Sequence, residues 1–372
     1  MTVELVRSEE IAALCSTVAQ VCRDAGGTGV VRGLDPDGPG FAPRVWRTLA
    51  EEVGVSCLGL PEDVGGLGGL AELAVVGECL GASLVPVPYL SSTVLTGQLL
   101  AHCGTPARSL LRRIVGGEVV ASVLLDRTGR WNPEGLPVRA VPGDDGWTVT
   151  GTANYVLDGP GAAELVVVAD GPDGPVVVGV DPKAAGVAIR RVETLDLTRP
   201  QARLDLTGAP GVLLAEGSHA LAAVDAAVDV ALVVQAAEML GGAQAALDLT
   251  LEYVRTRRQF GRVIGSFQAV KHRCADMLLD VELARSAVGR AVEVAERADR
   301  EPLALAEAAS VAKVWCAEAF ARVSAATVHL HGGIGFTWEH DAHLYFRRAR
   351  ADAALLGEAS YHRERIARLR AW

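Results

Sequence analysis

A polar break between two apolar helical stretches carries the residues best suited to hold an anionic ligand. Residues 255–277 read RTRRQFGRVIGSFQAVKHRCADM, and the stretches on either side repeat apolar residues at helical spacing. Arg257 therefore lies where one predicted helix ends, and Gly261 and Gly265 permit the chain to turn there. A planar guanidinium can bond two oxygens of a diphosphate at once, and Phe260 can lie against a flat ring. The same spacing also suits a plain helix–helix connector with solvated arginines, and spacing alone leaves both interpretations open.

A second polar stretch, residues 329–349, reads HLHGGIGFTWEHDAHLYFRRA and follows another predicted helix. The pair Gly332 and Gly333 can cap that helix at its C-terminus. Histidines gather in the same stretch, at positions His329, His331, His340 and His343. Their spacing is not that of an HExxH site, and no cysteine or carboxylate completes a convincing ligand set. We therefore expect packing or hydrogen-bonding histidines here and no metal.

Composition limits the classes of protein that remain. The chain has 372 residues and half of them are hydrophobic, which predicts a globular protein of two or three domains. Its net charge of −10 argues against broad nucleic-acid binding, which needs a basic face. No GxGxxG, GxxxxGK(S/T) or GxSxG motif occurs, so the sequence does not indicate a nicotinamide Rossmann site, a P-loop or a hydrolase nucleophile.

Cysteine usage and the N-terminus predict a compartment. The seven cysteines are scattered without CxxC spacing, as expected for reduced, mostly buried thiols. The N-terminal residues lack the basic start and apolar core of a signal peptide, and no unbroken apolar run of about eighteen residues occurs. We therefore expect a cytoplasmic protein without a membrane span.

The spacing of apolar residues changes twice along the chain. Residues 1–117 show helical spacing with turn-rich breaks, which predicts an N-terminal helical domain. Residues 118–215 are short valine-rich runs between Gly, Pro and Asp turns, which predict a middle β domain, a barrel or a sandwich. Residues 216–372 return to helical spacing and predict a bundle, with helices at about 218–255, 266–298, 302–328, 339–352 and 358–371.

The two polar stretches together resemble the signatures of a known family. RxxFGxxIxxFQ followed by ADM, and HGGIGF further along, are similar to the flavin-binding motifs of acyl-CoA dehydrogenases and occur in that family's order. The resemblance covers most of the chain. It implies an α+β fold with an N-terminal helical domain, a central small β-barrel domain and a C-terminal four-helix bundle. It also implies an FAD-dependent enzyme that desaturates an acyl-CoA thioester, with an electron-transfer flavoprotein or a similar protein as electron acceptor.

The resemblance assigns a cofactor-binding role to six residues, which are Arg257, Phe260, Gln268, His329, Gly332 and Gly333. Arg257 matches the arginine that contacts the FAD diphosphate across a subunit interface, and Gln268 matches the glutamine that helps hold the nucleotide end. Gly333 matches the second glycine of a pair that lets the backbone approach the diphosphate. His329 stands where the family usually has a glutamine, and an imidazole can still donate one hydrogen bond.

The catalytic base of the resembled enzymes has no clear counterpart. In that family a carboxylate takes a proton from the carbon next to the thioester. Counted from the glycine pair, the usual glutamate position falls on Leu356, which leaves Glu358, two residues later, as the candidate catalytic residue. The position that serves other members falls close to Ala231, and no glutamate lies there. We interpret Glu238, two turns further on, as a carboxylate on the surface of its helix.

The loops that would hold a flavin ring also depart from the family pattern. Residues 124–135 and 153–161 match poorly, and Tyr155 stands in for a tryptophan that covers the ring. The chain thus has the residues that contact the nucleotide end of FAD but lacks the ring pocket and the base. In this it resembles the β-type subunits of α2β2 acyl-CoA dehydrogenases, which act on bulky CoA esters including steroid side chains. This implies an acyl-CoA substrate and a paralogous subunit as partner. Catalysis by this chain alone through Glu358, a flavin oxidase or monooxygenase of the same fold, and a non-catalytic scaffold all remain open.

Overall fold

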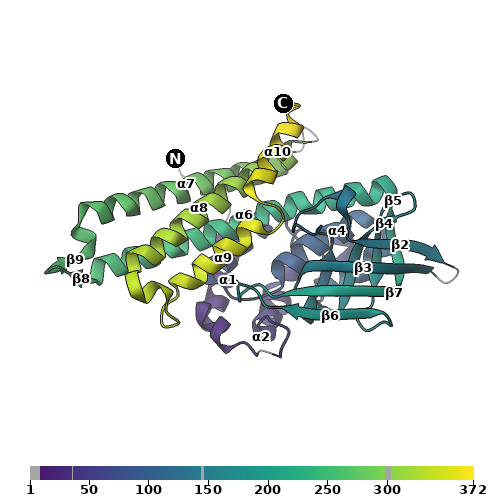
Figure 1. Ribbon diagram of the computed structural model, residues 1–372, viewed down its shortest axis with the longest axis horizontal. Coiled ribbons are helices and arrows are strands. Elements are labelled where there is room, and N and C mark those ends of the chain that lie inside the picture. Colours follow the sequence, from purple (N-terminus) through teal and green to yellow (C-terminus); the bar gives the residue numbers. More distant parts are fainter. Residues whose placement is uncertain (1–8, 36, 144–145, 298–302) are drawn as a thin grey trace.

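The chain begins with a layer of helices joined by short 3-10 and π-helical turns (Figure 1). The computed structural model describes residues 9–35, 37–143, 146–297 and 303–372. Most residues of α3 are buried, because α1 packs on one side of it and α6 on another. The α-helices of this layer are α1 (Glu9–Asp24), α2 (Pro43–Arg47), α3 (Leu70–Ser83), α4 (Gly97–Cys103) and α5 (Arg108–Val115).

Seven of the described strands, β1 to β7, form one sheet that closes into a barrel. The strand order is β1-β4-β2-β3-β7-β5, β5 pairs again with β4, and β6 lies beside β7. A single parallel pair, Arg139 with Asp170, joins β2 to β4 and completes the circle. This closure confirms the predicted β-barrel. The strands are β1 (Val120–Val123), β2 (Val138–Gly143), β3 (Gly146–Leu157), β4 (Glu164–Gly171), β5 (Gly174–Val180), β6 (Val187–Val192) and β7 (Gln201–Glu216).

Strand β4 joins the barrel to the helices. Its residues Leu165, Val167 and Ala169 belong to the core inside the barrel. The alternating residues Val166 and Val168 belong to the core that the sheet shares with the helices. Successive side chains of a strand point to opposite faces, so an unbroken apolar run is what a strand between two cores requires. The barrel is therefore fixed against the helical layer and not merely tethered to it.

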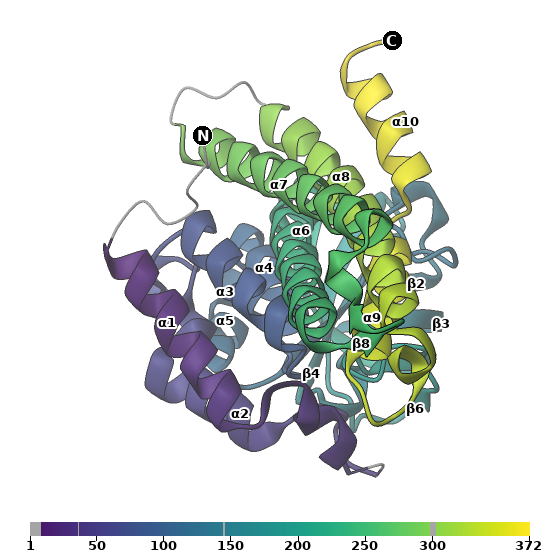
Figure 2. The ribbon, with the colours of Figure 1, turned by 90° about the vertical axis from the view of Figure 1, so that its left-hand side faces the viewer.

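α6 (Gly217–Thr256) is the axis of the C-terminal bundle and runs from the barrel to the far end of the molecule (Figures 1 and 2). The helix packs against α7, α8 and α9, and α3 and α4 contact it as well. The last helix, α10, packs on α8 and points away from the body of the protein. These elements are α7 (Gln268–Glu296), α8 (Ala304–His331), α9 (Ala342–Ala354) and α10 (Ala359–Leu369). The predicted α+β architecture is confirmed.

Two glycines let α3 and α6 approach until their backbones touch. A Cβ atom built on Gly81 would lie 1.9 Å from the carbonyl oxygen of Glu238, and one built on Gly241 would lie 1.9 Å from that of Glu78. No side chain fits at either distance, so a larger residue at either position would force the helices apart. The contact places Glu238 inside the protein, between α6 and α3.

Among the described helices, α6 has the length and composition that would allow it to cross a membrane. Within its most apolar window 67% of the residues are buried inside the protein, where α3, α4, α7 and α8 cover them. Single polar residues interrupt this window, so it contains no unbroken apolar run of about eighteen residues. Burial within the protein accounts for its apolar composition.

Candidate functional site

The segment between α6 and α7 forms a small hairpin at the far end of the bundle (Figure 1). β8 (Arg258–Gln259) pairs with β9 (Arg262–Val263), and Phe260 and Gly261 form the two-residue turn. Both turn residues have positive φ, 55° and 79°, as a type I′ turn requires. Phenylalanine rarely adopts this conformation, and Phe260 is also 91% exposed. The exposed ring is thus available to a molecule outside the chain, and its contact with FAD stays a prediction.

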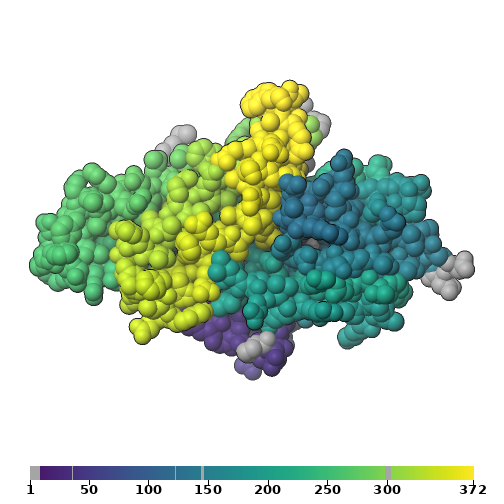
Figure 3. Space-filling view, viewed as in Figure 1, coloured from purple at the N-terminus to yellow at the C-terminus, as the bar shows by residue number. Residues whose placement is uncertain are grey.

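Positive charge is concentrated along this hairpin and the start of α7. Six basic residues and no carboxylate lie between positions 255 and 273, in a chain whose net charge is −10. Arg257, the C-cap of α6, is exposed, and its guanidinium has no partner among the described residues. The space-filling view shows this end of the bundle facing solvent (Figure 3). An unpaired guanidinium on a locally basic surface is suited to bind a diphosphate.

The second motif reaches the same end of the bundle, because the end of α8 lies beside the end of α6 (Figures 1 and 2). Tyr253 of α6 stacks on His331 with ring centroids 4.3 Å apart, and its hydroxyl donates to the His331 carbonyl at 3.4 Å. Gly332 has a φ of 63°, which favours glycine. A Cβ atom at Gly333 would meet nothing within 4 Å, and the φ of this residue is not positive. No described neighbour therefore requires glycine at 333, as expected where a molecule outside the chain approaches the backbone.

The other two predicted cofactor contacts are exposed at this end as well. Gln268 begins α7, and its amide donates to His272 Nε2 at 2.8 Å. His329 lines a groove of about 510 Å³ between α7 and α8, together with Arg273 and Arg322. The structure thus places all six predicted cofactor-binding residues at one end of the bundle, and their binding of FAD stays a prediction.

The remaining histidines of the second motif pack against aromatic rings. His331 lies 4.4 Å from His340 between ring centroids, and His343 meets Trp338 edge-on at 4.8 Å. His331 also donates from Nδ1 to the Thr327 carbonyl at 2.7 Å. Within the described parts of the chain, no group of three or more His, Cys, Asp or Glu side chains is arranged to hold a metal ion.

The position expected for a catalytic glutamate holds a buried leucine. Leu356 is 1% exposed and adopts a positive φ of 61°. The turn that contains it is fixed from inside, because the Lys313 ammonium donates to the carbonyls of Asp352 at 2.5 Å and Leu355 at 2.7 Å. His362 donates to the Leu356 carbonyl at 3.0 Å. An apolar side chain is therefore held in the core at this position.

Glu358 follows at the N-cap of α10 and is exposed. Its side chain does not cap the helix, and it has no partner among the described residues. Glu358 thus lies on the surface of this chain, and its catalytic role stays a prediction.

The buried carboxylates behind this turn are paired with arginines. Arg199 contacts Glu238 at 2.7 Å and Asp352 at 3.2 Å. Arg348 contacts Asp352 at 3.0 Å and Asp196 at 3.4 Å, and every side chain in the cluster is at most 7% exposed. The interpretation of Glu238 as a surface carboxylate is wrong, because α3 covers this side of α6 and Arg199 balances the charge. These carboxylates are therefore engaged in ion pairs inside the protein.

A hollow of about 350 Å³ lies between the barrel and the end of α9. Its lining includes Thr128, Tyr155, Arg199 and Leu355. Tyr155 has a φ of 59° and is 39% exposed, and a Cβ atom at Gly129 would lie 3.8 Å from its ring. The two loops that match the resembled family poorly therefore meet here, next to the turn that holds the buried leucine.

Comparison with known proteins settles the family. A family model described as "Acyl-CoA dehydrogenase, C-terminal domain" matches residues 221–369. Acyl-CoA dehydrogenase IpdE2 of Mycobacterium tuberculosis is 34% identical over 349 residues, which are 94% of this chain and 93% of IpdE2. The chain belongs to the acyl-CoA dehydrogenase family. The resemblance inferred from the two motifs is confirmed.

Solved structures of acyl-CoA dehydrogenases match over the whole chain. A variant of the Tcur3481-Tcur3483 steroid ACAD superposes with a TM-score of 0.86 at 34% identity and covers 98% of both chains. The ChsE4-ChsE5 complex from Mycobacterium tuberculosis gives a TM-score of 0.86 at 31% identity and covers 99% of both chains. At these identities the likeness extends beyond the general fold and confirms the predicted architecture.

Acyl-CoA dehydrogenases use FAD, and the chain fits one end of this cofactor better than the other. Arg257 has no partner in the described part of the chain, and open space lies where a Cβ atom of residue 333 would be; with the exposed Phe260, these residues suit a diphosphate and the groups next to it. The residues expected near the flavin ring do not fit in the same way. The position of the catalytic base is the buried Leu356, and the carboxylates behind it are paired with arginines.

Sequence reasoning missed the buried ionic cluster of this acyl-CoA dehydrogenase. Lys313 is fully buried within the apolar run SVAKVWCAEAF, and burial lowers its pKa to about 7 although the charge of Asp352 raises it. Asp158 is also buried, and burial raises its pKa to about 6 even though Ser91 donates to it at 2.5 Å. A charged residue inside an otherwise apolar helical run was the available signal for Lys313 and Glu238.

Proposed function

We propose that this chain is the partner-completing subunit of an FAD-dependent acyl-CoA dehydrogenase. The reaction is the α,β-desaturation of a bulky acyl-CoA thioester, of the steroid side-chain class, and a paralogous subunit supplies the catalytic base. One contrast carries the proposal. The residues for the FAD diphosphate are exposed at the end of the bundle, and Arg257 has no side-chain partner among the described residues, whereas the base position in the same chain is a buried leucine.

The end of the bundle has the chemistry to hold the nucleotide part of FAD bound mainly by the partner. Arg257 would bond the diphosphate, and the backbone at Gly332 and Gly333 would approach it where no side chain intervenes. Phe260 would lie against a flat part of the cofactor, and Gln268 and His329 would donate hydrogen bonds nearby. When bound, FAD supplies the acceptor for the hydride that leaves the β-carbon of the substrate.

The turn at Leu356 would leave this chain without a catalytic base of its own at the usual position. Lys313 and His362 bind the carbonyls of this turn, and Leu356 is buried there. Glu358 is the remaining candidate base in this chain, and it is exposed. The α-proton of the substrate would therefore be removed by a carboxylate of the partner. The residues of this chain that would hold the nucleotide part of FAD, Arg257, Phe260, Gln268, His329, Gly332 and Gly333, form the nucleotide clamp of the proposed complex.

The relatives support a steroid-type substrate and a paralogous partner. The two solved relatives are described as a steroid ACAD carrying two protein names and as the ChsE4-ChsE5 complex. Both align over at least 98% of this chain at more than 30% identity, so the same assembly is the simplest proposal here. An electron-transfer flavoprotein or a similar protein would reoxidise the cofactor.

The test is activity with and without a partner. The chain is purified alone and after co-expression with a paralogous acyl-CoA dehydrogenase subunit, and dye reduction is measured with a steroid side-chain CoA ester. We expect turnover only in the mixed preparation. A straight-chain acyl-CoA serves as the substrate control. Full turnover by the chain alone would contradict the proposed division of labour, and hydrogen peroxide release without dye reduction would indicate a flavin oxidase instead.

A further inference from the structure

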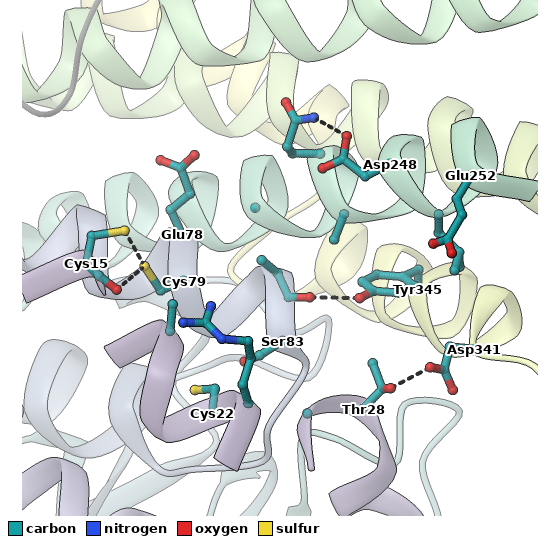
Figure 4. A pocket seen from close by; sticks show the side chains of 18 residues that line it. Cys15, Cys22, Thr28, Glu78, Cys79, Ser83, Asp248, Glu252, Asp341 and Tyr345 are labelled. Carbon is teal, nitrogen blue, oxygen red and sulfur yellow. Dashed lines mark hydrogen bonds between the residues drawn. The ribbon is translucent and has the colours of Figure 1, made fainter. Parts of the chain in front are cut away.

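A cavity of about 610 Å³ lies between α1, α3, α6 and the start of α9 (Figure 4). None of the residues proposed to contact FAD lines it. Three of the seven cysteines do: Cys15 and Cys22 from α1, and Cys79 from α3. The cavity is thus a second feature of the molecule, with thiol chemistry on its wall that the proposed dehydrogenase reaction does not use.

Two of these thiols touch. The Sγ atoms of Cys15 and Cys79 are 2.9 Å apart, within hydrogen-bond distance, and Cys79 Sγ also lies 3.6 Å from the Cys15 carbonyl oxygen (Figure 4). A disulfide needs a separation of about 2.05 Å, so the sulfur atoms would have to move closer by only about 0.9 Å. The two helices that carry them already pack side by side. Little backbone movement is therefore needed to join them.

The two thiols differ in access. Cys15 is half-buried and opens onto the cavity, whereas Cys79 is 7% exposed. The hydrogen bond from Cys79 lowers the pKa of the Cys15 thiol to about 7, against the effects of burial and of the Glu78 charge. The same hydrogen bond and its burial raise the pKa of Cys79. Cys15 is therefore the nucleophilic partner and Cys79 the resolving one.

The ionisable side chains around the cavity restrict the oxidant. Four carboxylates and one arginine line it, and they are Glu78, Asp248, Glu252, Asp341 and Arg23. Two of the carboxylates form ion pairs with arginines outside the lining, Glu78 with Arg285 at 3.0 Å and Asp341 with Arg32 at 2.7 Å. The other two, Asp248 and Glu252, disfavour anionic disulfides and peroxyanions, while a neutral hydroperoxide can enter. A small neutral oxidant is therefore the reagent that this cavity admits to Cys15.

We propose that Cys15 and Cys79 are a redox site, which a hydroperoxide oxidises to a disulfide that ties α1 to α3. The Cys15 thiolate attacks the peroxide oxygen, forms a sulfenic acid and releases water or an alcohol. Cys79 Sγ then attacks the sulfenic sulfur and displaces water, so that the two thiols lose two electrons and the peroxide gains them. A dithiol reductant returns the pair to its reduced form by exchange.

The link would act on the mobility of the first helix. Cys15 and Cys79 are 64 residues apart in the chain, so the disulfide closes a long loop and restricts the opening of α1. α1 also forms one wall of the cavity, and its attachment to α3 would hold that wall in place. Oxidation should therefore slow hydrogen exchange of the backbone amides in Glu9–Asp24.

The test uses the full chain, alone and in its complex. The protein is treated with hydrogen peroxide and unfolded, free thiols are counted, and linked peptides are mapped by mass spectrometry. We expect the number of free thiols to fall from seven to five, a Cys15–Cys79 linked peptide, slower exchange in α1, and full reversal by dithiothreitol. Cys22→Ser, on the same helix and cavity, is the matched control and should still form the link.

Two variants keep the proposal open to refutation. Cys15→Ser should leave Cys79 reduced, and Cys79→Ser should let a sulfenic acid accumulate on Cys15, where dimedone can trap it. The proposal is overturned if both thiols stay free in peroxide, if Cys15 links to Cys22 instead, or if Cys15 proceeds to a sulfinic acid while Cys79 remains a thiol. Flavin content does not enter this readout, so the result is independent of the proposed dehydrogenase function.

Discussion

Replacement of Arg257 by alanine tests the role of this residue in binding the nucleotide part of FAD. The guanidinium is exposed and has no partner among the described residues, so its removal breaks no described contact within the chain. The free energy of unfolding should therefore change by no more than about 0.5 kcal/mol. The FAD diphosphate, in contrast, loses a charge-assisted hydrogen bond worth about 1.5–3 kcal/mol. The dissociation constant for FAD should rise by roughly tenfold to a hundredfold.

The assay measures flavin retained by the purified complex after dialysis, together with thermal unfolding. Arg255→Ala is the matched control, because it removes the same charge from the last turn of α6, where the family resemblance assigns no contact. We expect Arg257→Ala to lose flavin and Arg255→Ala to keep it. Equal flavin content in both variants and the parent would remove Arg257 from the site, and equal losses in both would reduce its role to general surface charge.

Three further predictions concern buried and exposed charges. Glu358→Gln should leave turnover of the complex within about twofold, because the carboxylate is exposed. A fall of about a hundredfold would show that Glu358 of this chain is the catalytic base. Arg199→Met should lower the free energy of unfolding in urea by about 3–5 kcal/mol, since Glu238 and Asp352 lose a partner in the core; a change below about 1 kcal/mol would contradict the cluster's role. Asp158 binds its proton more tightly when folded, with a pKa raised from 3.8 to about 6, so stability should fall as pH rises from about 4 to about 6. Asp158→Asn should remove that slope and stabilise the protein at pH 7 by up to about 3 kcal/mol, and an unchanged slope in thermal unfolding would refute the assignment.

The elements that carry the motifs could be predicted because their signals are local. The polar break at Arg257 interrupts two stretches of strong helical period, and the valine-rich runs before them have the length and spacing of strands. The strand β4 illustrates the same point, since its unbroken apolar run reflects two cores. The sequence therefore indicated the architecture and the residues at the end of the bundle.

The partners of the buried charges could not be predicted in this way. Glu238 was expected on a helix surface, because a single carboxylate on an amphipathic helix usually faces water. Its burial depends on α3, which reaches it through Gly81 from a distant part of the chain, and on Arg199, which enters from the loop before β7. The contact between Cys15 and Cys79 likewise arises from the packing of two helices. Such pairings are properties of the packed structure and have no local pattern.

The amount of flavin per chain, measured together with native mass, tests the central claim most directly. The claim is that this chain supplies a clamp for the nucleotide part of FAD while a paralogous subunit supplies the ring pocket and the base. We predict that the chain alone holds little flavin, and that co-expression with the partner yields an α2β2 complex with about one FAD per heterodimer. A stable homo-oligomer of this chain, with one FAD per chain and acyl-CoA dehydrogenase activity, would contradict the account.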